Sequence, residues 1–265
     1  MSLNGKVVII TGASRGIGRD MAVALGEAGA NVVVAARSET VPDPRLPGTI
    51  YTVAKEVEER GAKALPIKVD ATKDEDVENM VAKTMETFGR IDALIYNPSV
   101  LIPGNTRTVQ PRHLDLLYRL NIRAPLMTIR AVLDPIKASG GGHIIYISSR
   151  AAVFPGPGPY SEEQQARART GGAFYGMTKA AMERYSQSLA AEVQSDNIAV
   201  NVLSPQGRIK TPGNIYAQNS RENPDLDFEE AVAMGKAARW ILEQDPQTFT
   251  GNILFDEEMV AKYHL

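Results

Sequence analysis

The stretch Thr11-Gly12-Ala13-Ser14-Arg15-Gly16-Ile17-Gly18 decides the fold of this 265-residue chain. The apolar run Val7–Ile10 precedes it and an apolar helical pattern, Met21–Leu25, follows it, so the order is strand, glycine-rich turn, helix. A helix N-terminus offers free backbone N–H groups and the positive end of the helix dipole, and glycines let the chain approach a phosphate closely. The turn therefore predicts a nucleotide site; the alternative is a tight turn without a ligand.

The composition limits the classes of function. A formal net charge of -2 gives no indication of binding to nucleic acid or to an anionic membrane. The absence of cysteine excludes disulfides, thiolate catalysis and cysteine metal sites, and the three histidines show no ligand spacing. The chain has no apolar run long enough to span a bilayer and no signal-peptide pattern at its start. We expect a cytoplasmic protein with no metal, no nucleic-acid partner and no membrane partner.

Strand and helix patterns alternate along the whole chain. This order predicts an α/β fold, in which one doubly wound parallel sheet of seven strands carries helices on both faces of a single domain, 1–265. The expected strands are Lys6–Thr11, Asn31–Ala36, Ala64–Val69, Ala93–Tyr96, His143–Ile147, Ala199–Leu203 and Asn252–Phe255. The expected helices begin near Gly18, Thr49, Lys73, Arg112, Tyr175 and Phe228.

Three irregular stretches follow strand ends: Ser38–Gly48, Pro155–Gly172 and Ser204–Leu226. Because the carboxyl ends of the strands hold the ligand in a doubly wound sheet, we expect substrate loops at about 150–174 and 204–226. Two further interpretations stay open. The stretch 38–48 is equally consistent with a solvent loop, and the apolar residues of the substrate loops could pack against each other. Those residues are Val153, Phe154, Phe174, Ile215 and Tyr216.

A tyrosine and a lysine stand one helical turn apart at Tyr175 and Lys179, so both side chains lie on one helix face. A nearby ammonium stabilises a phenolate, and a phenol tuned in this way can give a proton to a carbonyl or take one from an alcohol. A hydroxyl from Ser148 or Ser149, at the end of the fifth strand, can hydrogen-bond a substrate oxygen. Strand alternation allows only one of the two to face the crevice. Asn121, polar in an apolar helix, is expected to bind a backbone carbonyl or a water.

Taken together, these motifs resemble the short-chain dehydrogenase/reductase family over nearly the whole chain. The motifs are Thr11-Gly12-x-x-x-Gly16-x-Gly18, Asp70, Asn97, Asn121, Ser149 and Tyr175-x-x-x-Lys179. The resemblance implies a single-domain Rossmann fold and a catalytic set of Asn121, Ser149, Tyr175 and Lys179. It implies that the tyrosine transfers the proton, the lysine lowers its pKa and binds the nicotinamide ribose, the serine orients the substrate, and the asparagine holds a water.

We expect the cofactor to be NADP. The second strand ends without an acidic residue that would bind a ribose hydroxyl, and Arg37 there and Arg15 in the glycine turn can both pair with a 2′-phosphate. The resemblance implies that Ile209 and Thr211 hold the nicotinamide carboxamide; Asp70 is assigned to the adenine amino group. The full set expected at the cofactor is Gly12, Ser14, Arg15, Gly16, Ile17, Gly18, Arg37, Asp70, Ala71, Asn97, Tyr175, Lys179, Ile209 and Thr211.

The chain departs from the family pattern in three places. Pro98 and Ser99 follow Asn97 where Ala and Gly are common, and the loop after Pro205 carries an extra residue. The gap between Ser149 and Tyr175 is also longer than usual. Tyr160 lies inside that gap but has Gln164, not lysine, four residues later, so Tyr175 is the better catalytic candidate.

The sequence therefore predicts an NADP-dependent oxidoreductase that acts on CH–OH groups or the corresponding carbonyls of a hydrophobic small molecule. A catalytically silent NADP-binding sensor or scaffold, and an enoyl reductase of the same fold, are the alternatives. The cationic side chains Arg150, Arg167 and Arg169 could bind an acidic substrate group or lie in solvent. The helices 112–138 and 175–194 resemble those of family interfaces, so we expect a homodimer or homotetramer.

Overall fold

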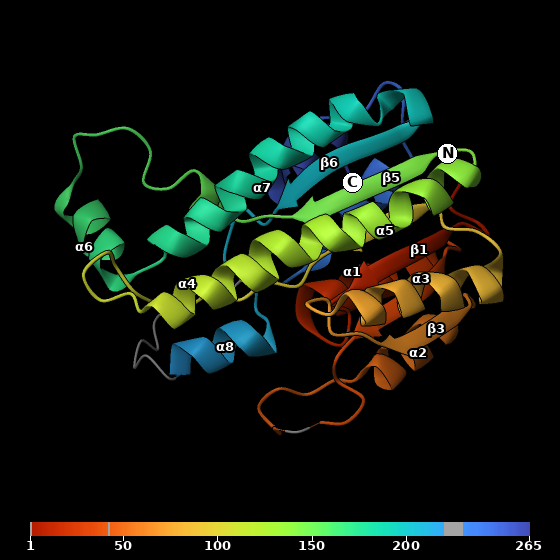
Figure 1. Ribbon diagram of the computed structural model, residues 1–265, viewed down its shortest axis with the longest axis horizontal. Coiled ribbons are helices and arrows are strands. Elements are labelled where there is room, and N and C mark those ends of the chain that lie inside the picture. Colours follow the sequence, from red (N-terminus) through yellow and green to blue (C-terminus); the bar gives the residue numbers. More distant parts are fainter. Residues whose placement is uncertain (1, 42, 220–229) are drawn as a thin grey trace.

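A seven-stranded parallel sheet organises the molecule (Figure 1). The computed structural model describes residues 2–41, 43–219 and 230–265. The strand order is β3-β2-β1-β4-β5-β6-β7, so the order reverses between β1 and β4, where a doubly wound sheet opens a crevice. The strands are β1 Val7–Thr11, β2 Asn31–Ala36, β3 Ala64–Lys68, β4 Ala93–Tyr96, β5 Gly142–Ile147, β6 Ile198–Ser204 and β7 Ile253–Phe255.

The helices form a layer on each face of this sheet. Helices α1 (Gly16–Glu27), α2 (Ile50–Glu58) and α9 (Val232–Leu242) pack on one face, and α3 (Asp74–Phe88), α5 (Ala124–Ala138) and α7 (Ala173–Glu192) pack on the other. The remaining described helices are α4 (Pro111–Tyr118), α6 (Glu162–Thr170), α8 (Pro212–Asn219) and α10 (Asp256–Tyr263), and the short turns are η1 (Arg119–Arg123), η2 (Arg150–Ala152) and η3 (Gln194–Asp196).

Alternation along each strand divides the apolar core into two. Val8 and Ile10 of β1 pack under α1, whereas Val7 and Ile9 pack in the cluster under α5 and α7. Every residue of β1 is buried, as expected of strands covered on both faces. The sheet is therefore held rigidly from both sides, and its carboxyl edge presents the loops that build the site.

The predicted fold class and all seven strands are confirmed, each strand within one residue at either end. The helix expected from Arg112 is interrupted by η1, a π-helical turn at Arg119–Arg123. The stretch 155–172, expected to be irregular, contains α6, which begins at a capping box formed by Ser161 and Gln164. Figure 1 shows α6 standing out from the body of the molecule. The helix start expected near Phe228 lies outside the described residues, and α9 begins at Val232.

Candidate active site

The glycine turn joins β1 to α1 and has little room for a side chain at its glycine positions. A Cβ on Gly18 would lie 2.5 Å from the Gly12 carbonyl oxygen and 2.8 Å from Asn97 Nδ2. Gly12 and Gly16 have positive φ angles of 68° and 55°, which favour glycine. Asn97, which follows β4, donates to the Gly12 carbonyl over 3.1 Å. The turn is thus packed against the end of β4, and the first free N–H groups of α1 lie at the sheet crevice.

Two arginines meet beside this turn. Arg15 Nη2 donates to Ser38 Oγ over 3.0 Å and to the Gly48 carbonyl over 3.2 Å, which ties the stretch 38–48 to the glycine turn. Burial, and then the charge of Arg37, lower the pKa of Arg15. Arg37 also acts on Asp70: burial raises the pKa of that carboxyl, but hydrogen bonds from Thr72 and the Arg37 charge bring the pKa below its usual value. Two like charges side by side repel each other, and an anion bound between them would relieve that repulsion.

Other residues expected at the cofactor are buried, partly buried or packed against the glycine turn. Ser14 and Ala71 are buried, and Ile17 packs against the core under α1. Thr211 lies against the turn, because a Cβ on Gly16 would be 3.0 Å from the Thr211 side chain. Ile209 is buried in the core, and its carbonyl accepts hydrogen bonds from the Thr211 N–H and from Asn214.

Asn121 lies in the π-helical turn and is fully buried. Its amide group pairs with the backbone of Val100: Nδ2 donates to the carbonyl and Oδ1 accepts from the N–H, both over 2.9 Å. Nδ2 also donates to Thr178 Oγ1 over 3.1 Å. The expectation of a backbone carbonyl partner is correct. A π-helical turn often marks a functional site, and this one joins the loop after β4 to the helix that carries Tyr175.

Tyr175 is 9% exposed, and the hydroxyls of Ser99 and Ser149 hydrogen-bond its phenol. Ser149 also caps η2 by accepting from the Ala151 N–H over 3.2 Å. Ser148, in contrast, turns toward α7 and donates to Glu183 over 2.6 Å. Of the two adjacent serines, Ser149 is therefore the one beside the phenol. Sequence reasoning missed the Ser99 contact, although its place two residues after Asn97 was a usable signal.

Lys179 is 1% exposed and is held beneath Tyr175. Its Nζ donates to the Ile147 carbonyl over 2.8 Å and to the Tyr146 hydroxyl over 3.2 Å, and lies 5.6 Å from the centre of the Tyr175 ring. Burial lowers the pKa of Lys179 to about 7, and the nearby Glu183 carboxylate opposes this shift.

The direction of the tyrosine shift differs from the expected one. Burial raises the pKa of Tyr175, and the hydrogen bonds from Ser99 and Ser149 oppose that rise. The expected lowering by Lys179 does not dominate, because the phenol has lost water and the lysine donates to Ile147 and Tyr146 instead. At neutral pH the phenol is protonated, which suits a proton donor.

The expected substrate residues divide between different surroundings. Val153 is 57% exposed, and Phe174 lines an apolar cavity of about 430 Å³ between α4 and α7 with Leu117, Tyr118 and Met177. Among the cationic side chains, Arg150 Nη1 contacts the Gln206 carbonyl over 3.4 Å and Arg169 binds Gln165. The side chains of Arg167 and Tyr216, and residues 220–226 of the second loop, lie outside the described part of the molecule.

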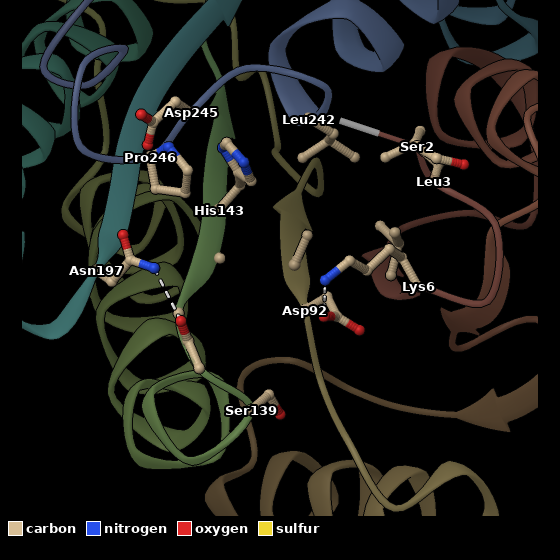
Figure 2. A pocket seen from close by; sticks show the side chains of 15 residues that line it. Ser2, Leu3, Lys6, Asp92, Ser139, His143, Asn197, Leu242, Asp245 and Pro246 are labelled. Carbon is tan, nitrogen blue, oxygen red and sulfur yellow. Dashed lines mark hydrogen bonds and ion pairs between the residues drawn. The ribbon is translucent and has the colours of Figure 1, made fainter.

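Another cavity, of about 480 Å³, lies at the amino ends of the strands, the opposite edge from Tyr175 (Figure 2). Asp92 at its wall accepts hydrogen bonds from Lys6, Arg90 and the Val7 N–H, so its charge is already compensated. At this edge the contacts of Asp92 join the starts of β1 and β4. The candidate active site is at the carboxyl edge. In the described ranges, no cluster of three or more His, Cys, Asp or Glu could hold a metal ion, and no helix is long and apolar enough to cross a membrane.

Comparison of the sequence with known proteins finds a matching family and similar proteins. The family model described as short chain dehydrogenase matches residues 6–222. Hydroxysteroid dehydrogenase-like protein 2 from Homo sapiens is 34% identical over 261 residues, which cover 98% of this chain and 58% of the human protein. The Danio rerio protein of the same name is 33% identical over 260 residues, 98% of this chain and 59% of that protein. The chain thus spans about three fifths of the length of these relatives.

Solved structures share the whole fold. A short chain dehydrogenase from Mycobacterium thermoresistibile superposes with a TM-score of 0.82 at 31% identity, over 100% of this chain and 89% of that one. L-sorbose reductase from Gluconobacter frateurii, complexed with NADPH and L-sorbose, gives a TM-score of 0.80 at 25% identity, over 96% of this chain and 97% of that one.

Proposed function

The chain belongs to the short-chain dehydrogenase family, and on that premise we propose that it is an NADP(H)-dependent oxidoreductase acting on a carbonyl or the corresponding alcohol. One observation carries the proposal: the buried Tyr175 phenol is hydrogen-bonded by Ser149 and lies above the buried Lys179, at the sheet edge where the glycine turn begins α1. An acid, an orienting hydroxyl and a cation are thereby assembled beside a phosphate-binding turn.

Two features of the chain and one of a similar protein fit a phosphorylated dinucleotide. The glycine turn is a cradle that a side chain on Gly18 would fill, because its Cβ would collide with the Gly12 carbonyl. The paired charges of Arg15 and Arg37 suit a 2′-phosphate, and no acidic residue ends β2 to repel it. The similar L-sorbose reductase is complexed with NADPH. We assign the pyrophosphate to the N-terminus of α1 and the 2′-phosphate to the two arginines.

The proposed chemistry uses four side chains. Bound NADPH supplies the hydride. Tyr175, whose raised pKa keeps it protonated at neutral pH, donates its proton to the substrate carbonyl oxygen, and Ser149 hydrogen-bonds the same oxygen. Lys179 stabilises the phenolate that remains. Asn121 fixes the loop after β4 through Val100, which keeps Ser99 against the phenol.

The proposed substrate is a small hydrophobic alcohol or carbonyl compound, bound between the η2–α6 loop and α8.

We also propose that 1–265 acts as one domain and assembles as a homodimer or homotetramer through α4, α5 and α7. The apolar cavity between α4 and α7, with Tyr118 60% and Met177 58% exposed beside it, supports this face as the contact.

A substrate panel tests the proposal. Purified protein is mixed with NADPH or NADH and with aldehydes, ketones and sugars, and the loss of reduced nicotinamide absorbance is followed. We expect turnover of at least one carbonyl class with NADPH in preference to NADH. Tight NADPH binding without turnover of any class would favour a catalytically silent NADP-binding module instead.

A further inference from the structure

Two buried polar side chains beside Lys179 have no part in the proposed chemistry. Ser148 follows the last residue of β5 and faces α7 like Tyr146 two residues earlier, because strand side chains alternate. Its hydroxyl donates to Glu183 Oε1 over 2.6 Å. Ser148 is 4% exposed and Glu183 is 7% exposed, so this contact is closed to solvent. Burying a carboxylate lowers the stability of a fold unless the carboxylate is hydrogen-bonded or lies near an opposite charge.

The spacing of residues on α7 indicates that the opposite charge near Glu183 is Lys179. Tyr175, Lys179 and Glu183 follow one another at four-residue intervals, so they form one stripe along the helix face that covers β5. Burial lowers the pKa of Lys179, and the Glu183 carboxylate opposes that shift. Burial also raises the pKa of Glu183, and the Lys179 charge opposes that rise. The Ser148 hydrogen bond acts in the same direction on the carboxylate.

We propose that Glu183, held in place by Ser148 one helical turn from Lys179, is a positioning residue that favours the charged form of the buried Lys179 side chain. The consequence for turnover depends on the proposed function, because it concerns the cation beneath the Tyr175 phenol. The charge state of Lys179 itself is a property of the folded chain and can be measured without a substrate.

The other groups around Lys179 cannot take over this part. On β5 the Tyr146 hydroxyl and the Ile147 carbonyl accept its hydrogen bonds, and Tyr96 of β4 stacks on Tyr146 with ring centres 6.1 Å apart. On its own helix, Lys179 faces Tyr175. Burial raises the pKa of all three tyrosines, so each is neutral at pH 7. Among the described residues, Glu183 is the carboxylate that opposes the lowering of the Lys179 pKa.

The direct test is the titration of Lys179 in the folded, full-length protein. Lysine carbons are isotopically labelled, NMR follows their shifts with pH, and the signal lost in Lys179→Met identifies the residue. We expect wild-type Lys179 to titrate near pH 7, far below the ordinary lysine value of 10.5. Glu183→Gln keeps the side-chain shape and removes the charge, so the titration should move down by about one pH unit or more. Glu192→Gln, an exposed carboxylate on the same helix, should not move it.

The serine provides an independent arm. Ser148→Ala removes one oxygen, favours protonation of Glu183, and should shift the Lys179 titration in the same direction by a smaller amount. In Glu183→Gln the serine has no charge left to hold, so the double variant should titrate where the single Glu183→Gln variant does. Additive shifts would show that Ser148 acts on Lys179 by itself and would overturn the positioning assignment.

Activity then separates this inference from the proposed function. If the wild type reduces carbonyls, the alkaline limb of its kcat profile should move to lower pH in Glu183→Gln, by the shift measured in the titration. A moved titration in a protein without reductase activity would defeat the proposed function alone. An unmoved titration in Glu183→Gln would defeat the inference alone. If Glu183→Gln does not fold, Ser148→Ala decides, and an unchanged Lys179 titration there overturns the proposal.

Discussion

Reversing the charge of Arg37 should change the cofactor preference. Arg37 directly follows β2 and lies beside Arg15, and its charge acts on both Arg15 and Asp70. The substitution Arg37→Asp therefore places a carboxylate where we assign the 2′-phosphate. A hydrogen bond to a charged group contributes about 1.5–3 kcal/mol. At 1.4 kcal/mol per tenfold, NADPH should bind about 10- to 150-fold more weakly. NADH, which lacks the phosphate, should bind with nearly unchanged affinity.

Titration of both cofactors by fluorescence measures this difference. Arg45→Asp is the matched control, because Arg45 lies on the neighbouring stretch, is 68% exposed at its side chain and already pairs with Asp43. The control makes the same change in net charge and should leave both affinities almost unaltered. Equal losses of NADPH and NADH affinity in Arg37→Asp would refute the assignment of the arginines to the phosphate.

Two further predictions concern the frame of the site. Gly18→Ala should lower the free energy of unfolding by about 1–3 kcal/mol in urea denaturation, because the new Cβ meets the Gly12 carbonyl at 2.5 Å and backbone atoms cannot give way; an unchanged midpoint would contradict the packing described here. Burial lowers the pKa of His143 from 6.5 to about 4. Between pH 6.5 and pH 4 the unfolded chain therefore binds a proton at His143 and the folded chain does not. The free energy of unfolding falls as the pH drops through this range. The loss in the free energy of unfolding should reach about 3 kcal/mol near pH 4, and His143→Phe should be less sensitive to pH in this range. If the wild type and His143→Phe lose stability equally with falling pH, other groups cause the loss.

The strands and the glycine turn could be predicted from the sequence because their signals are local. Val7, Val8, Ile9 and Ile10 make a continuous β-branched run, and such a run is typical of a strand buried on both faces. The turn after it needs glycine at Gly12 and Gly16, because both have positive φ angles, which is a local requirement of the backbone. The pairing of Tyr175 with Lys179 follows from helix spacing alone.

Other features depend on tertiary contacts that no local pattern carries. The π-helical turn at Asn121 lies inside a continuous apolar helix pattern, and its hydrogen bonds go to distant residues, Val100 and Thr178. Helix α6 is polar on every side, so it has no apolar period to find. In the sequence, Tyr146 resembles any core residue of a strand and Glu183 resembles any charged residue on a helix surface. Their relation to Lys179 depends on the packing of α7 against β5.

The most direct test of the central claim compares Tyr175→Phe with the wild type in two assays, NADPH binding and carbonyl reduction. Phenylalanine keeps the buried ring and removes the hydroxyl that Ser99 and Ser149 contact. We expect turnover to fall by about 100-fold or more, because a general acid is lost, and NADPH affinity to be nearly preserved. Turnover that survives the substitution would contradict the assignment of Tyr175 as the proton donor.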